Sequence, residues 1–207
     1  WRDFWQQIWV NKGGLINKDL KRPQEDFIDK KIAKSVVNGT TKINSVDKEI
    51  KNLYELGYMH NHMRMYVASI TTNISKSHWK TPAKWMYYHL LDGDWASNSL
   101  SWQWVAGSNS NKKYYANQEN INKYFNDVQK GTFLDKSYEE IINMDIPKVL
   151  DEKINFENKT NLPEIKKLEI DNKLPTLIYN YYNIDPNWRI DEKANRILLL
   201  EPEIFSK

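Results

Sequence analysis

The sequence predicts an all-α fold, a helical bundle-like domain with an irregular C-terminal extension. Apolar and aromatic residues recur at intervals of three and four over much of the first 130 residues, as on one face of a helix. Gly, Pro and capping residues divide this region into segments of helical length. Hydrophobic residues make up 40% of the 207 residues, which is enough for a buried core.

The N-terminal helix is predicted from Trp1, Trp5 and Trp9, which lie on one helical stripe. The segment 11–14 ends it, because its glycines suit a C-terminal cap. The stretch 18–42 is polar and irregular, so no element is predicted there.

The middle of the chain is divided by start and stop signals. A helix is predicted from Asn44, where Asp47 completes a capping pattern, to Gly57. A second covers about 59–74, and a third begins at Thr81-Pro82, because Pro suits the first helical position.

The next helices follow a break at 92–94. One runs to Gly107, and a short one is predicted over 117–125. Ser137 and Glu140 form a capping-box pattern for another.

The C-terminal third has a different character. Residues 147–173 are charged and weakly periodic, as in a linker. The apolar run 197–200 resembles a buried strand, which needs neighbouring strands. We therefore predict three parts: a partial helical domain at 1–130, an extension or linker at 131–196, and at 197–207 the first strand of an α/β domain that this chain lacks.

Composition limits the function classes. The net charge of +3 is compatible with nucleic acid but too small to identify a nucleic-acid binder. The chain has no Cys, which excludes disulfides, thiolate zinc sites and Cys-ligated iron–sulfur clusters. Its 9 Trp and 12 Tyr suit a core, a stacking platform or a redox relay. Without a signal peptide or membrane-length apolar run, we expect a cytoplasmic, monomeric protein with no membrane partner. No metal site is expected either, because the His spacing fits no metal motif.

Two groups of polar residues share helical faces. Asp94, Asn98 and Trp102 are spaced by four and lie on one stripe. Taken alone, this stripe favours a helix cap, a solvated amide and a core Trp over a ligand site.

Arg64 lies on a second face, together with Asn61 and Met65. It is expected to pair with Asp92 or Asp94. At the surface such a pair contributes little, and a buried pair needs further hydrogen bonds, which a bound polar ligand supplies.

Four segments resemble motifs of the DNA photolyase and cryptochrome family. Segment 57–69 reads G-Y-M-H-N-H-M-R-M-Y-V-A-S and resembles G-W-M-H-N-R-x-R-M-x-x-A-S. Segment 92–104 reads D-G-D-W-A-S-N-S-L-S-W-Q-W and resembles D-G-D-x-A-x-N-x-x-x-W-Q-W. The first four residues resemble W-R-E/D-F. The segment before the first signature is matched by Gly39, Thr41, Val46, Asp47 and Leu53.

The resemblance implies a helical domain that holds FAD in a folded form and transfers an electron, under light, to a pyrimidine dimer in DNA. Asn98 is expected at the reactive edge of the isoalloxazine, where an amide tunes the redox state. Asp92 is expected to pair with Arg64 beside the ring. The alternative is an ordinary charge network at helix ends. The implied flavin contacts are Trp1, Asn61, Arg64, Asp92, Asp94 and Asn98.

The resemblance also implies a tryptophan relay. Trp102 matches its proximal member and Trp79 its middle member, although both rings also suit a core. No Trp stands at the distal position, for which Trp9, Trp85 or Trp95 are substitutes.

The implied substrate pocket lies beside the flavin. It is lined by Asp3, Met65 and Trp104, because a flipped base pair needs apolar and aromatic walls. Asp3, if protonated, is expected to hydrogen-bond the lesion. Trp104 also suits a surface edge. His62 replaces an Arg that meets the DNA backbone, and a neutral His is a weaker phosphate partner.

Three function classes follow. The first is a light-driven, FAD-dependent lyase that repairs pyrimidine dimers and has damaged DNA as its partner. The second is a cryptochrome-like blue-light photoreceptor without repair activity, which His62 favours. The third is a flavin-free helical binding module. The family's antenna domain and its T-S-x-L-S phosphate loop are missing from this chain, so we expect weak FAD retention by the chain alone.

Overall fold

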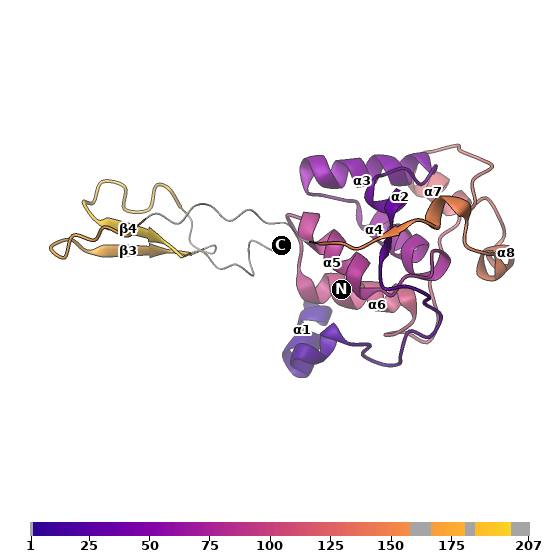
Figure 1. The fold of residues 1–207 in the computed structure, drawn as a ribbon, viewed down its shortest axis with the longest axis horizontal. Coiled ribbons are helices and arrows are strands. Elements are labelled where there is room, and N and C mark those ends of the chain that lie inside the picture. Colours follow the sequence, from indigo (N-terminus) through magenta and orange to yellow (C-terminus); the bar gives the residue numbers. More distant parts are fainter. Residues whose placement is uncertain (1, 158–166, 181–184, 200–207) are drawn as a thin grey trace. The chain divides into compact units, whose positions relative to one another are not determined.

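The computed structural model describes residues 2–157, 167–180 and 185–199. The chain divides into two compact units, Trp1–Glu157 and Asn158–Lys207. The first unit is built mainly from helices, which confirms the predicted all-α class (Figure 1). Its helical elements are α1 (Arg2–Lys12), η1 (Gly13–Asn17), α2 (Lys34–Val37), α3 (Asn44–Leu56), α4 (Asn61–Ser69), η2 (Ile70–Ile74), α5 (Lys80–His89), α6 (Trp95–Ala106), α7 (Gln118–Phe125), α8 (Tyr138–Asn143) and η3 (Lys148–Leu150).

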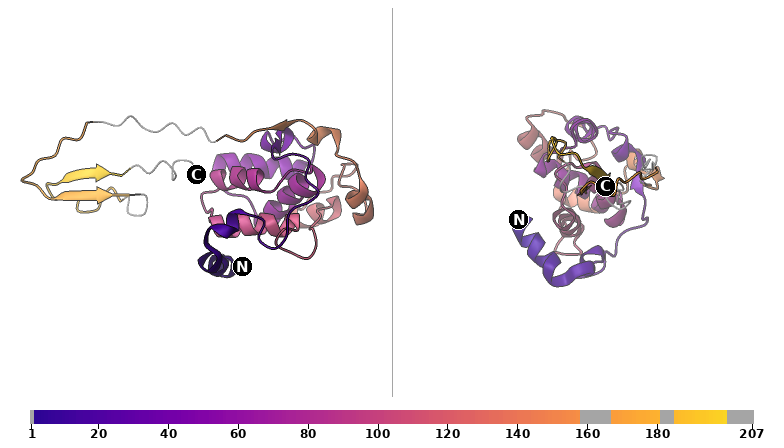
Figure 2. Two further views of the ribbon diagram at one scale, coloured as in Figure 1. Left: turned by 60° about the horizontal axis from the view of Figure 1, so that its bottom comes forward. Right: turned by 90° about the vertical axis from the view of Figure 1, so that its left-hand side faces the viewer.

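Helix α6 is the central element of this unit. It packs against α1, α4 and α5 (Figures 1 and 2). Most of its residues are buried, as expected for a helix with neighbours on several sides. Asp94 caps its N-terminus by accepting a hydrogen bond from Ser97 N at 2.9 Å. Gly107 ends the helix in a left-handed conformation with φ 83°.

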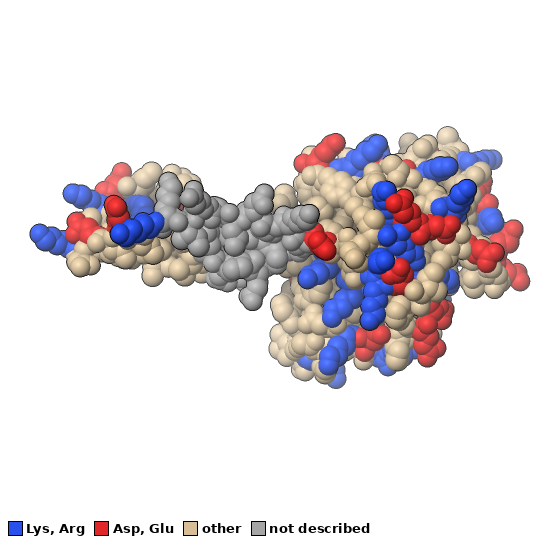
Figure 3. Space-filling model, viewed as in Figure 1, with Lys and Arg blue, Asp and Glu red and all other residues tan. Residues whose placement is uncertain are grey.

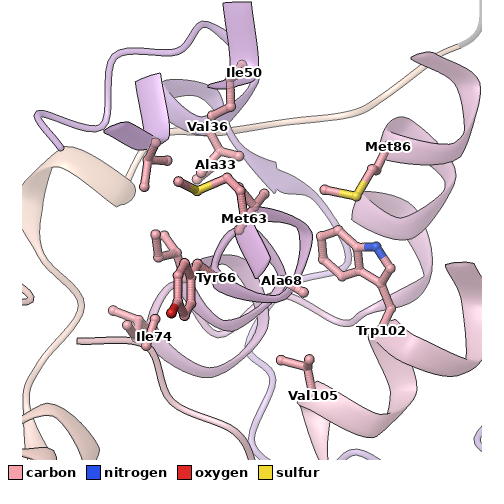
Figure 4. Packing of buried hydrophobic residues seen from close by; sticks show 14 of the residues in the cluster. Ala33, Val36, Ile50, Met63, Tyr66, Ala68, Ile74, Met86, Trp102 and Val105 are labelled. Carbon is pink, nitrogen blue, oxygen red and sulfur yellow. The ribbon is translucent and has the colours of Figure 1, made fainter. Parts of the chain in front are cut away.

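The helices enclose one large hydrophobic cluster. Its largest side chains include Trp79, Trp85 and Trp102, all buried. Figure 4 shows the Trp102 indole facing Met86 of α5, with Met63 of α4 nearby. Two of the predicted relay rings therefore also belong to the core.

The predicted helix over 59–74 is present as two pieces. Helix α4 continues directly into η2, a wider π-helical turn in which Ser75 N donates to the carbonyl of Ile70 at 2.8 Å. Thr71 and Thr72 are buried, and their hydroxyls donate to carbonyls four residues back, each at 2.7 Å. Side-chain bonds thus satisfy polar groups inside the core.

The helix predicted from Asn44 to Gly57 is confirmed, and Gly57 ends it with φ 64°. Asp47 acts differently from the predicted helix cap. Its carboxylate accepts from the backbone nitrogens of Thr41 and Lys42, at 2.7 and 3.1 Å. It therefore holds the turn that leads into α3.

Residues 131–157 pack with the helical unit. Leu134, Ile141 and Leu150 are buried in its core. Strand β2 (Lys153–Ile154) pairs antiparallel with β1 (Ile32–Ala33), inside the stretch 18–42 that was expected to be irregular. The compact unit therefore extends past the predicted boundary at residue 130, because short apolar pairs in this stretch join the core of the helical unit.

The second unit contains two parallel strands, β3 (Thr176–Tyr179) and β4 (Asn195–Leu198). Ile178 is paired with Ile197 in their register. The strand predicted at 197–200 thus begins two residues earlier and has a neighbour within the chain, and its residue 200 lies outside the described residues.

Candidate flavin site

A cavity of about 500 Å³ opens in the helical unit beside α6. This volume lies in the range of about 300–1,000 Å³ that small-molecule and cofactor sites occupy. Helix α1, helix α4, helix α6 and the turn before α6 supply its walls. The lining residues are Arg2, Trp5, Asn61, Arg64, Met65, Ala68, Leu90, Asp92, Gly93, Asp94, Ser97, Asn98, Ser101, Trp102, Trp104 and Val105.

Both polar faces predicted from helical spacing line this cavity. Asn98 and Trp102 project from one stripe of α6 and Asp94 from its cap, while Asn61 and Arg64 come from α4. A spacing of three or four residues was enough to predict each face. Only the packing of α4 against α6 brings the two faces together.

Asn98 is held in one orientation. The residue is 9% exposed, and its Nδ2 donates to the carbonyl oxygen of Ala83 on α5 at 2.8 Å. No described residue donates to Asn98 Oδ1, which leaves that oxygen as an acceptor at the cavity wall. The expectation from sequence that Asn98 is a solvated amide is therefore wrong, because its side chain is buried and held in one orientation.

Asp94 links helix α1 to the cavity. Its side chain is 6% exposed and accepts from Arg2 Nε at 3.3 Å, from Gln6 Nε2 and from the backbone nitrogen of Ser97. A carboxylate with three donors is satisfied despite its burial. Helix α1 is therefore attached to the N-terminus of α6 by charge as well as by packing.

Arg64 pairs with Asp92 across the cavity rim. Its Nη2 lies 3.0 and 2.9 Å from the two carboxylate oxygens, and its Nε donates to the carbonyl of Met59 at 2.8 Å. The guanidinium also lies 5.6 Å from the centre of the Tyr58 ring. Of the two partners expected from sequence, the structure selects Asp92, because Asp94 is already occupied by Arg2.

The relay and substrate candidates lie in different environments, some at the cavity wall and one in the core. Trp102, Trp104 and Met65 line the cavity. Trp79 is fully buried in the core, and its indole Nε1 donates to Asp19 Oδ1 at 2.5 Å.

Besides Trp79, three candidates are absent from the described residues that line the cavity. Asp3 is exposed on α1. His62 stacks on Tyr124, with ring centres 4.4 Å apart. Trp1, an expected flavin contact, lies outside the described residues.

Sequence reasoning missed several lining residues. Arg2 and Trp5 come from the first helix, and Ser97 and Ser101 from α6. Arg2 lies inside the W-R-E/D-F motif of residues 1–4. Trp5 was identified only as a member of the helical stripe that it forms with Trp1 and Trp9. Ser97 and Ser101 carried no signal, because Ser is common on both helix surfaces and site walls.

The lining suits an aromatic ligand with a polar edge. Trp102 and Trp104 supply flat apolar surface, while Asn98, Asp94 and Arg64 supply hydrogen-bonding groups. The Ser97 hydroxyl is buried without a hydrogen-bond partner in the described part of the chain. An unpartnered buried hydroxyl costs about 1–3 kcal/mol, which a polar ligand atom removes. These residues therefore fit an isoalloxazine, whose polar edge exposes donors and acceptors.

Comparison with known proteins agrees with this geometry. The family described as the FAD binding domain of DNA photolyase matches residues 1–181. The chain belongs to this family. Proteins named deoxyribodipyrimidine photo-lyase from Agrobacterium fabrum and Streptomyces griseus are 35% and 34% identical to it over 111 and 115 residues. Those matches cover 52% and 55% of this chain, but only 23% and 25% of the two proteins. Cryptochrome DASH from Xenopus laevis is 29% identical over 138 residues, 63% of this chain and 24% of that protein.

Membership of the photolyase FAD-binding family explains why three of the four motifs, at residues 1–4, 57–69 and 92–104, meet at one cavity. The matched segments span about a quarter of these relatives.

None of the described helices is long and apolar enough to span a bilayer. Basic and acidic side chains intermingle on the face of the helical unit drawn in Figure 3.

Proposed function

We propose that the protein containing this chain is a light-driven, FAD-dependent lyase that repairs pyrimidine dimers in DNA. One observation carries the proposal: a single cavity combines an oriented amide, Asn98, with the aromatic wall of Trp102 and Trp104. Relatives named deoxyribodipyrimidine photo-lyase support it.

In this proposal, each lining residue has a binding or positioning role. Asn98 and Asp94 meet the polar edge of the isoalloxazine, and the Arg64–Asp92 pair lies beside the ring. When bound, the flavin supplies light-driven one-electron chemistry. Trp102 is the ring of the predicted relay that lines the cavity, and Trp79 lies in the buried core.

The DNA lesion is assigned to the part of the cavity beside Met65 and Trp104. Trp104 is half-buried, so its ring has surface available for stacking on an extruded base. His62 and Asp3 lie outside the described cavity lining, and we assign them to contacts at its rim.

Retention of FAD by this chain alone is expected to be weak. The cavity is lined by two cations, Arg2 and Arg64, and both are paired with carboxylates that also line it. The lining therefore offers no net positive charge to a diphosphate, and additional donors are needed elsewhere. Stoichiometric flavin in the purified chain would contradict this expectation.

A cryptochrome-like photoreceptor is the second candidate. His62 replaces the phosphate-binding Arg that the resemblance implies, and it stacks between His60 and Tyr124. A His in such a stack is a poor phosphate anchor. The relative named cryptochrome DASH is compatible with this alternative.

Repair of a defined lesion separates the two functions. The full-length protein, reduced and illuminated, is mixed with an oligonucleotide carrying one cyclobutane pyrimidine dimer, and restored thymines are counted by chromatography. Repair that falls in Trp104→Phe but not in the matched variant Trp188→Phe, at a Trp of the second unit, supports a lyase. Bound flavin that photoreduces without any repair supports the photoreceptor instead.

A further inference from the structure

A second cavity lies at the C-terminal end of α6 and shares no lining residue with the flavin cavity. Its volume is about 210 Å³, below the roughly 300–1,000 Å³ of sites for drug-sized ligands, so it fits a small group. Segment 22–26, the end of α6 with Gly107, and Lys113 supply its walls. Lys76 lies beside it, close to Lys113. We call Arg22, Lys76 and Lys113 the cation cluster.

Arg22 is held in place by one of its nitrogens. Its Nε donates to the carbonyl oxygen of Gly107 at 2.8 Å. None of the ion pairs between described residues includes Arg22, so its two terminal nitrogens are not paired with a described carboxylate. A guanidinium presents a planar fork of donors that matches two oxygens of one phosphate group.

Lys113 and Arg22 converge on Gly107. A Cβ atom at Gly107 would lie 3.1 Å from Lys113 Cγ and 3.6 Å from Arg22 Nη2, so glycine lets both side chains lie over the end of α6. Lys113 Nζ pairs with Asp26, whose side chain is 56% exposed. An ion pair at the surface contributes little to stability, so another anion can replace this carboxylate at low cost.

Lys76 adds a third positive charge. It is partly buried and has φ 55°, a left-handed conformation that is uncommon for a residue with a side chain. Burial, and then the charge of Lys113, lower the pKa of Lys76, whereas Asp26 raises it. The fold therefore holds two ammonium groups close enough to repel each other, and a bound anion relieves that repulsion.

Positive charge around the pocket exceeds negative charge. The lining holds two carboxylates, Glu25 and Asp26, and both residues are exposed. The cation cluster is flanked by two further exposed cations, Lys21 and Lys112, which are the sequence neighbours of Arg22 and Lys113. An anion with two negative charges is therefore accommodated without an excess of negative charge.

The carbonyl end of a helix disfavours an anion, because its last carbonyl oxygens lack helical partners. At the end of α6, the Gly107 carbonyl accepts from Arg22 Nε. The Ser108 carbonyl accepts from the backbone nitrogens of Lys21 and Arg22, at 2.9 and 3.1 Å. Two of the acceptors that would repel an anion are therefore already bonded.

Gln24 fixes one wall of the pocket. The residue is 4% exposed, its Nε2 donates to the Ser77 carbonyl at 3.0 Å, and its Oε1 accepts from Trp79 N at 2.9 Å. These bonds join segment 22–26 to the turn that follows Lys76. The cation cluster is thus positioned before a ligand arrives, which lowers the entropic cost of binding.

We propose that this pocket is a second ligand site, which binds inorganic phosphate or the terminal phosphate of a small phosphomonoester. Arg22 donates to two phosphate oxygens, Lys113 exchanges Asp26 for a third, and Lys76 supplies further positive charge. The ligand joins segment 22–26 to the loop after α6, so its binding stabilises the helical unit. The site is independent of the proposed function, because it shares no lining residue with the flavin cavity.

Equilibrium dialysis of the chain against radiolabelled inorganic phosphate, at an ionic strength held constant with chloride, measures the affinity. We expect saturable binding that weakens about tenfold or more in Arg22→Gln and in Lys113→Gln, because each variant loses a charged hydrogen bond to the ligand. Lys51→Gln, at an exposed cation of α3, is the matched control and should bind as the parent does. Arg64→Gln should also leave binding unchanged, and a loss there would place the phosphate in the flavin cavity and overturn the proposal.

Asp26→Asn gives the sharpest test, because it is expected to strengthen phosphate binding. The variant removes the carboxylate that competes for Lys113, and a variant that only damages the fold does not bind more tightly. Weaker binding in Asp26→Asn, or unchanged binding in Arg22→Gln, overturns the proposal when circular dichroism shows that the variant folds. An equal loss in Lys51→Gln also overturns it, because the binding is then a nonspecific effect of surface charge.

A DNA oligonucleotide without terminal phosphates separates a small anion from a nucleic-acid backbone. Its phosphates are diesters, so it is expected to leave the bound phosphate in place. Displacement by this oligonucleotide would assign the pocket to backbone phosphates and overturn the proposal of a small-anion site.

Discussion

One nitrogen of Arg64 contacts both carboxylate oxygens of Asp92, at 3.0 and 2.9 Å. The pair joins α4 to the turn before α6, at the rim of the cavity. The side chains are 22% and 52% exposed, so solvent screens the charges and the pair contributes little to folding stability. Its main effect is to fix the position of α4 relative to the turn before α6, which are two walls of the cavity.

We therefore expect Arg64→Ala to weaken FAD binding more than it weakens folding. A tenfold loss of affinity corresponds to about 1.4 kcal/mol. The free energy of unfolding is expected to change by no more than about 1 kcal/mol. Flavin fluorescence titration of the full-length protein and urea unfolding measure the two quantities. Lys51→Ala, on the exposed side of α3, is the control, and equal affinities for the two variants would contradict the assignment.

Asn98→Asp is expected to destabilise the protein by about 1–3 kcal/mol at neutral pH. The variant replaces the donor to the Ala83 carbonyl with a buried carboxylate. Burial raises the pKa of such a carboxyl, so the deficit is expected to shrink as the pH falls and the group becomes protonated. Asn11→Asp is a matched control, because Asn11 makes the same kind of bond to the Gln7 carbonyl on an exposed surface. Equal losses in urea unfolding of both variants would rule out burial as the cause.

Gly57→Ala is expected to destabilise the protein for two separable reasons. Gly57 has φ 64°, and a Cβ atom there would lie 2.3 Å from Leu91 Cγ. Left-handed backbone costs about 1–2 kcal/mol in a residue with a side chain. Gly131→Ala isolates that cost, because Gly131 has φ 72° and open space around it.

The extra loss at Gly57, measured by thermal unfolding, is attributed to the contact with Leu91. Leu91 is 84% exposed and can move. Adding Leu91→Ala to Gly57→Ala is therefore expected to recover the stability that the contact with Leu91 removes. Failure of that rescue would mean that the backbone bond from Leu91 N to the Gly57 carbonyl, at 2.8 Å, is the sensitive element.

Stability is expected to decline as the pH rises above about 10. Burial raises the pKa of Tyr54, Tyr66, Tyr114 and Tyr115 above the ordinary phenol value of 10.0. The unfolded chain then loses these protons first, so the stability present below pH 10 is lost as the pH rises towards the folded values. Urea midpoints measured across this range are expected to fall less steeply in Tyr66→Phe. Tyr58→Phe, at an exposed ring, is the control and should retain the parent slope.

Much of the fold was predictable because helix signals are local. The capping box of Ser137 and Glu140 is present, and Gly57 and Gly107 end their helices in left-handed conformations. The packing of residues 131–157 was not predictable in this way. Ile141 lies in the helix that this capping box begins, but nothing local indicates that Leu134, Ile141 and Leu150 are buried in one core with residues of 32–121.

The sequence by itself determined the helical faces of the site and, through four motifs, the family to which the chain belongs. Residues four apart on a helix share a face whatever surrounds them, so Asn98 and Trp102 were predictable as neighbours. The tertiary structure alone decided the partners across elements. Asp94 accepts a hydrogen bond from Arg2, 92 positions away, and Arg64 forms its ion pair with Asp92. The pairing of charges depends on how α1, α4 and α6 pack, and no local period encodes it.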